Sequence, residues 1–112
     1  MIIKSRRDFN VVSEIKKNSI NLQFFGPIVG IVGKRSDQIS ISQDQTRLID
    51  VIHAMCMRYG ETFEEIALKN EELNSGLIVF VNGRHLIDSR HKLELSEENE
   101  MQFMIASQMK GG

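Results

Sequence analysis

The chain has 112 residues, of which 41% are hydrophobic and 26% are charged, a composition typical of one soluble globular domain. Fourteen basic and fifteen acidic residues leave a formal net charge of -1, so no overall positive field favours a phosphate backbone, and we expect no direct nucleic-acid partner. Cys56 is the only cysteine, which excludes an internal disulfide and favours a reducing, cytoplasmic setting. No apolar run has the length of a membrane span, and charge begins at Lys4, so we expect neither a membrane segment nor a signal peptide.

The N-terminal part of the chain predicts an extension followed by a β-hairpin. Residues 1–19 mix basic and apolar residues without a clean period, and we expect an N-terminal extension of uncertain structure. From Ile20 to Phe24 apolar residues alternate with polar ones, which indicates a half-buried strand that Gly26-Pro27 ends. The same alternation around Ile39 and Ile41 predicts a second strand, joined to the first by a flexible loop.

The middle of the chain predicts a main helix with one apolar face. Its apolar stripe has helical spacing and consists of Leu48, Ile52, Met55 and Tyr59. Thr46 is the expected N-cap, and Gly60 is expected to end the helix in the left-handed conformation.

A second, shorter helix is predicted directly after the first. Thr62 and Glu65 have the spacing of a capping box, in which the two side chains bond each other's free backbone amides. We expect this helix to run to about Leu73.

The C-terminal part predicts strands and a tail. The continuous apolar run Leu77–Val81 is typical of a central strand covered on both faces, and Asn82-Gly83 favours a tight hairpin after it. Alternation from Met101 to Ile105 predicts the last strand. Residues 106–112 have no period that would hold them on a core, so we expect a flexible tail ending in Gly-Gly.

This order of strands and helices predicts an α+β domain over residues 20–105. It lacks the strict strand–helix alternation of a doubly wound fold, and one amphipathic helix has to bury its stripe against a sheet. A mixed sheet of four or five strands packed on one main helix, the β-grasp arrangement, satisfies both conditions.

Four features in chain order resemble a family of small ubiquitin-like carriers. They are Phe24-Phe25-Gly26 after the first strand, Arg58-Tyr59-Gly60 at the end of the helix, Val79-Phe80-Val81-Asn82-Gly83, and Gly111-Gly112. In this order they resemble the small subunit of molybdopterin synthase (MoaD), the thiamine sulfur carrier (ThiS), the ubiquitin-related modifier and the archaeal small modifiers. The resemblance covers residues 20–112. Where the family usually has a glycine before the last strand, Asn99 is expected to accept the unusual φ.

The resemblance implies a carrier without a catalytic site or bound cofactor of its own. A ubiquitin-activating-type (MoeB/ThiF-like) partner enzyme uses ATP to adenylate the C-terminal carboxylate, and Gly112 then becomes a thiocarboxylate. Met109, Lys110 and Gly111 are expected to thread toward the nucleotide, because small, flexible residues pass a narrow tunnel. Molybdopterin (Mo/W cofactor) synthesis, with the synthase large subunit as a further partner, is the leading pathway.

Three other interpretations remain open. The tail reads Ala106–Lys110 without the proline that precedes the glycines in many molybdopterin members, so the same carrier can serve tRNA thiolation. It can also be a protein modifier that forms isopeptide bonds to lysines. In an inert β-grasp interaction module, by contrast, Gly-Gly is accidental, and chance gives such an ending to roughly one chain in two hundred.

Two apolar residues are candidates for contact with the activating enzyme. Strand alternation turns Met104 away from Met101 and Phe103, and Phe25 away from Phe24. Packing of either residue beneath a loop or a helix is an equally good interpretation. His53 and Cys56, three residues apart on the helix, are too few ligands for a metal site, and we expect none.

Overall fold

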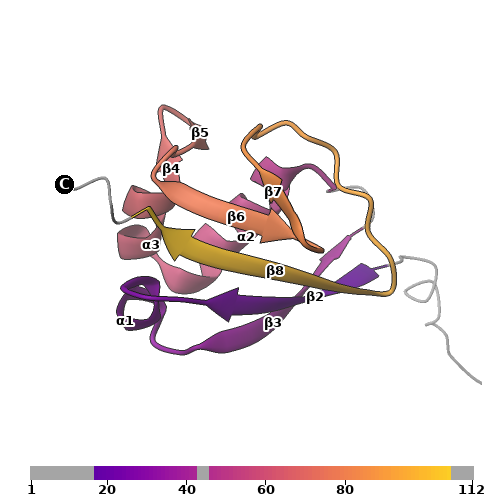
Figure 1. The fold of residues 1–112 in the computed structure, drawn as a ribbon, viewed down its shortest axis with the longest axis horizontal. Coiled ribbons are helices and arrows are strands. Elements are labelled where there is room, and N and C mark those ends of the chain that lie inside the picture. Colours follow the sequence, from indigo (N-terminus) through magenta and orange to yellow (C-terminus); the bar gives the residue numbers. More distant parts are fainter. Residues whose placement is uncertain (1–16, 43–45, 107–112) are drawn as a thin grey trace, which may run out of the picture.

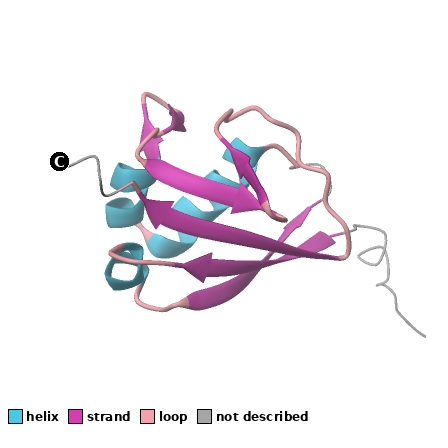
Figure 2. Cartoon of the chain, viewed as in Figure 1, coloured by secondary structure: helices cyan, strands magenta, loops and turns pink. Residues whose placement is uncertain are grey.

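The computed structural model describes residues 17–42 and 46–106, which form a mixed sheet with helices on one face (Figure 1). Figure 2 shows the same layers by type of secondary structure. The strands of the main sheet lie in the order β3-β2-β8-β6-β7. This arrangement confirms the predicted α+β class and the β-grasp fold.

The first and last strands of the sheet run side by side. Strand β2 (Lys17–Phe24) pairs antiparallel with β3 (Ser36–Ser42) and parallel with β8 (Glu98–Ile105). Strand β6 (Leu77–Val81) pairs antiparallel with both β8 and β7 (Arg84–Leu86). The sheet therefore places β8 in its middle, and β6 beside it is an interior strand that is paired on both sides.

Strand β2 starts earlier than the sequence indicated. It begins at Lys17 rather than Ile20, and Ser19 lies opposite both Ser40 and Glu98. The polar residues at this end give no alternation in the sequence, yet their backbone groups continue the ladder. The first strand therefore includes three residues that were assigned to the N-terminal extension, and residues 1–16 lie outside the described part of the chain.

Helix α2 (Leu48–Tyr59) covers the inner face of the sheet as predicted. Leu48, Ile52 and Met55 are fully buried, and Tyr59 is half-buried. The N-cap is Arg47 rather than Thr46. The carboxylate of Asp50 accepts hydrogen bonds from the Arg47 backbone N–H (3.0 Å) and from the Arg47 guanidinium (3.1 and 3.2 Å). The Arg47–Asp50 pair therefore caps the start of the helix in place of the expected Thr46.

Gly60 joins α2 to a second helix, α3 (Glu61–Ala67), in a conformation that favours glycine. Its φ of 94° is positive, but its ψ of -170° lies outside the left-handed helical region expected for it. The extended ψ turns the chain directly into α3, so that Gly60 is both the C-cap of α2 and the N-cap of α3. The capping box predicted for Thr62 and Glu65 is therefore wrong, since α3 starts at Glu61 without a side-chain cap.

Helix α3 also ends earlier than predicted. Its C-cap is Leu68, and the chain then forms a small hairpin of β4 (Leu68–Lys69) and β5 (Glu72–Leu73). The turn residues Asn70 and Glu71 have positive φ values of 55° and 66°. A glutamate rarely adopts such a φ, so the residue types here do not indicate a turn, and the predicted helix end at Leu73 is wrong.

Two further segments differ from the sequence-based expectation. Residues Ile28–Val32 form a short helix, α1, where a flexible loop was expected. Strand β6 is buried on one face only, because Ile78 and Phe80 are half-exposed on the face opposite to α2. The apolar run that indicated burial on both faces therefore leaves part of its apolar surface uncovered.

Asn99 has a different role from the one expected. It lies in β8 without a positive φ and is 1% exposed. Its side-chain amide donates to the backbone carbonyls of Ser19 (3.0 Å) and Ser96 (2.9 Å), and its oxygen accepts from the backbone N–H of Ser96 (2.8 Å) and from Asn82 Nδ2 (3.2 Å). The side chain thus ties the loop before β8 to β2 and to the Asn82-Gly83 turn.

Candidate functional site

The end of β8 is the point from which the C-terminal segment leaves the described domain. The backbone N–H of Ala106 donates to the carbonyl of Gly76 (3.0 Å), so the first residue of the expected tail is bonded to the body. The residues expected to thread and to react, which are Met109, Lys110, Gly111 and Gly112, lie outside the described residues.

Met104 faces the open side of the sheet near this exit. Its neighbours Phe103 and Met101 are fully buried against the helices, whereas Met104 is half-buried on the other face. In the register it lies opposite Ile78 of β6. Directly opposed residues share a face, so these two side chains form an apolar pair across the strands.

Phe25 lies at the same end of the sheet. Phe24 pairs with Phe103, and the Phe25 backbone N–H continues this ladder by donating to the Phe103 carbonyl (3.0 Å). Phe25 and Met104 each follow a member of that pair, and 43% of Phe25 is exposed. Phe25, Met104 and Ile78 together are called the exit patch below, because all three lie at the end of the sheet where β8 ends.

Further residues of the open face were missed from the sequence. The Phe80 and His85 rings stack with centroids 5.2 Å apart, and Gln102 Nε2 donates to Gln23 Oε1 (3.1 Å). A two-residue turn at Asn82-Gly83 fixes which residues oppose each other, so Phe80 and His85 were predictable as a pair. The apolar exit patch is thus continued by an aromatic pair and a row of amides.

The core beneath the exit patch is aromatic and is held by a polar cluster. The Phe24 ring lies 5.7 Å from Phe103 and 5.7 Å from Tyr59, and Tyr59 lies 5.6 Å from Phe63. The Tyr59 hydroxyl donates to Asp37 (2.7 Å), which also pairs with Arg58 (3.2 Å). This cluster joins the end of α2 to the start of β3.

The pKa values of this cluster follow from its contacts. Partial burial alone would raise the pKa of Asp37, but hydrogen bonds from Tyr59, the Gln38 backbone and Arg58, with the charge of Lys34, outweigh it and lower the pKa to about 2. Burial and the Asp37 carboxylate raise the pKa of Tyr59 well above its usual value. Asp37 is therefore ionised and Tyr59 neutral at physiological pH.

The remaining histidine, cysteine and acidic side chains of the described residues offer no metal site. Within residues 17–42 and 46–106, no three histidine, cysteine or acidic side chains are grouped to hold a metal. Burial, with a smaller contribution from Glu64, raises the pKa of the Cys56 thiol to about 11, so it stays protonated. No helix in this part of the chain has the length and apolar character of a membrane span.

Comparison with known proteins identifies the fold. No protein-family model matches the chain, and no curated protein matches its sequence. Small archaeal modifier protein 1 (SAMP1) of Methanosarcina acetivorans has a TM-score of 0.64 and 17% identity, over 87% of this chain and 99% of that one. A putative molybdopterin converting factor subunit 1 of Pyrococcus furiosus has a TM-score of 0.62 and 17% identity, over 79% of this chain and 97% of that one. Urm1 of Trypanosoma brucei has a TM-score of 0.61 and 17% identity, over 80% of this chain and 92% of that one. The described domain thus has the ubiquitin-like β-grasp fold of these proteins.

Proposed function

We propose that this chain is a ubiquitin-like sulfur carrier whose C-terminal glycine, Gly112, is activated by a partner enzyme of the ubiquitin-activating type. The observation that carries the proposal is the position of the Gly-Gly ending in the sequence: it follows the central strand of a β-grasp sheet, and Gly112 is six residues after the anchored Ala106. The fold is one that a modifier protein and a putative molybdopterin converting factor subunit also have.

The chemistry needs only a free carboxylate from the carrier. In the partner enzyme, an oxygen of the Gly112 carboxylate attacks the α-phosphorus of ATP, pyrophosphate leaves, and a mixed anhydride with AMP forms. Sulfide attacks the carbonyl carbon and AMP leaves, which makes the thiocarboxylate directly. A persulfide donor instead gives an acyl disulfide as AMP leaves, and a thiol of the partner enzyme then attacks the donor's sulfur, forms a disulfide with it and releases the thiocarboxylate. ATP is consumed by the partner enzyme and is not a cofactor of this chain.

Contact with the activating enzyme is assigned to the exit patch. Interfaces are enriched in aromatic residues and methionine, and Phe25 and Met104 supply both beside the strand that leads to the tail. Among the possible uses of the sulfur we favour synthesis of the molybdenum or tungsten pterin cofactor, with the synthase large subunit as acceptor. Transfer to tRNA and isopeptide bonds to protein lysines are the alternatives.

Intact mass after incubation with an activating enzyme, ATP and a sulfur source tests the proposal. Replacement of one oxygen by sulfur on the full chain is the expected result, and high-mass conjugates support the protein modifier instead. An unchanged mass with every activating enzyme of the source organism leaves an inert interaction module and overturns the proposal.

Deletion of Gly112 separates activation from folding. We expect the shortened chain to lose adenylate formation, measured as ATP–pyrophosphate exchange, because the reacting carboxylate is displaced by one residue. Its thermal unfolding should match that of the full chain, since the core is built from residues 20–103. Exchange at the undiminished rate would contradict the assignment of Gly112.

A further inference from the structure

A groove lies on the helical side of the molecule, away from the exit patch. It has a volume of about 1120 Å³ and is bounded by α2, α3, the β4–β5 hairpin and the loop at Ser89 and Arg90. Its apolar lining includes buried Ile49 and half-buried Cys56 and Leu68. The neutral Cys56 thiol adds no charge to this lining, so the bottom of the groove can receive an apolar side chain.

The walls of the groove are acidic. Five glutamates line it, three from α3 and two from the hairpin: Glu61, Glu64, Glu65, Glu71 and Glu72. Its two arginines are already engaged, because Arg47 pairs with Asp50 (3.1 Å) and Arg90 pairs with Glu72 (3.1 Å). Among the described residues no cation pairs with the other four glutamates, so the groove presents negative charge to whatever enters it.

The hairpin wall is fixed in place. The backbone N–H of Asn74 donates to the Ala67 carbonyl (2.8 Å), and that of Leu73 donates to Ser89 Oγ (2.7 Å). Ser89 is only 6% exposed and lines the groove, and its hydroxyl proton has no acceptor in the described part of the chain. A buried donor without a partner is costly, and a backbone carbonyl of an occupant at this wall would satisfy it.

We propose that this groove binds a lysine- or arginine-bearing peptide segment of a second protein. An apolar side chain of the segment packs over Ile49 and Leu68, its cations meet the glutamates of α3 and the hairpin, and a carbonyl accepts from Ser89. A basic peptide satisfies the acidic walls, the apolar lining and the unpaired hydroxyl at once, which neither a metal ion nor an anion does. The inference is independent of the function proposed for Gly112.

The groove and the exit patch are on opposite sides of the sheet, because α2 and α3 cover one face and Met104 lies on the other. In Figure 1 the helices lie behind the strands that face the viewer. Both surfaces can therefore be occupied at the same time, and a protein held in the groove does not compete with one bound at the exit patch.

The test uses the isotope-labelled full chain and a short synthetic peptide of alternating lysine and leucine. We expect saturable shifts of the Ile49, Cys56 and Leu68 amide signals and none at Met104. A lysine–serine peptide of equal length and charge should bind about tenfold more weakly, because it lacks apolar side chains. Equal affinity of the two peptides, or shifts spread over the surface, would mean non-specific attraction and overturn the proposal.

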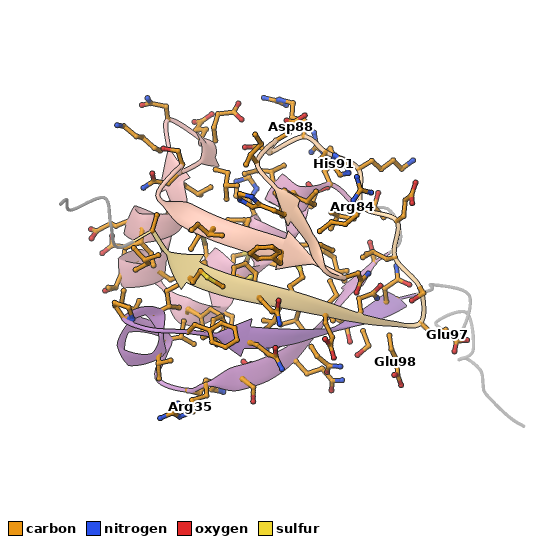
Figure 3. The ribbon with its side chains drawn as sticks, viewed as in Figure 1. Arg35, Arg84, Asp88, His91, Glu97 and Glu98 are labelled. Atoms are coloured by element: carbon orange, nitrogen blue, oxygen red, sulfur yellow. The ribbon has the colours of Figure 1, made fainter. Side chains whose placement is uncertain are left out.

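Two double variants with the same change in charge supply the control. Glu64→Lys with Glu71→Lys alters the groove, whereas Glu97→Lys with Glu98→Lys alters an exposed acidic pair at the other end of the sheet (Figure 3). We expect at least about tenfold weaker binding from the first pair and less than about threefold from the second. Equal losses of peptide affinity in the two double variants would refute the groove as the binding site. Glu64→Gln with Glu71→Gln repeats the test without charge reversal if the lysine pair unfolds the chain.

The chain's own basic N-terminal segment is the competing occupant. Lys4, Arg6 and Arg7 are replaced by glutamate in the full chain, and peptide affinity is measured again. Unchanged affinity supports a groove that is open to a second protein. A severalfold gain means that the chain's own segment held the groove, and the proposed partner is then wrong.

Discussion

Asp37 is the residue whose ionisation contributes most clearly to stability. Its pKa is lowered from 3.8 to about 2 in the folded chain, so its contribution is complete above the unfolded value and is lost as the pH falls from about 4 toward 2. The shift corresponds to about 2 kcal/mol, and solvent screening at the exposed Arg58 and Lys34 reduces this to about 1 kcal/mol.

The variant Asp37→Asn tests this contribution. We expect it to lower the free energy of unfolding in urea by about 1 kcal/mol at pH 7. The difference from the parent chain should shrink as the pH approaches 2.5, because the parent carboxylate is then becoming protonated. Glu97→Gln, which removes one exposed carboxylate, is the control and should change little at either pH. A pH-independent difference would assign the effect to packing.

At the same scale, single residues show why sequence patterns found the site only in part. Alternation was enough to turn Met104 and Phe25 away from the core, and both are at least partly exposed. Ile78 was missed because a continuous apolar run is also what a strand buried on both faces looks like. Asn99 was misread because the bonds of its side chain join residues 80 positions apart, a distance that no local pattern reports.

Among the elements, the β4–β5 hairpin stores backbone strain. A glutamate at a φ of 66° costs about 1–3 kcal/mol, and Glu71 has no ion pair in the described residues that would offset it. Strain that persists in a wall of the proposed groove is consistent with a role in shaping that wall.

Glu71→Gly should therefore stabilise the chain. Relief of the positive φ exceeds the entropic cost of glycine, and we expect the free energy of unfolding to rise by about 0.5–1 kcal/mol. Glu72→Gly is the control: it adds the same flexibility in a strand and removes the ion pair with Arg90, so it should destabilise. If both variants destabilise equally, Glu71 is not strained.

The elements that the sequence predicted well are those with several periods of pattern. Helix α2 has three turns of apolar stripe, and β2, β3 and β8 each alternate over several residues. Helix α1 and the β4–β5 hairpin have five and two residues per element, which is too short for a period to emerge. Their formation depends on tertiary contacts, such as those of the hairpin with Ala67 and Ser89.

On the scale of the whole molecule, the two faces of the sheet differ in how far they are covered. One face is sealed by α2 and α3, and the other leaves the exit patch half-exposed beside the strand that leads to Gly112. Under the proposed function this asymmetry separates two roles, because the sealed face supplies the stability and the open face is available for contact with the activating enzyme.

Met104→Ser should weaken binding of the activating enzyme by about tenfold, while the free energy of unfolding falls by no more than about 1 kcal/mol. Ile87→Ser is the control, because Ile87 is 78% exposed and belongs neither to the exit patch nor to the lining of the groove. Affinity measured by titration calorimetry should be unchanged for the control. Equal effects of the two substitutions would argue against the exit patch as the contact surface.

The polar cluster at the end of α2 also contains the residue that dominates the intrinsic fluorescence of this chain. Tyr59 is the only tyrosine and there is no tryptophan, so ultraviolet emission arises almost wholly from one phenol wedged between Phe24, Phe63 and a carboxylate. Cys56, one helical turn away, is likewise the only thiol, and its raised pKa means that a dye should react with it only slowly at neutral pH. Tyr59 emission therefore reports on the packing of the aromatic core beneath the exit patch without any change to the sequence.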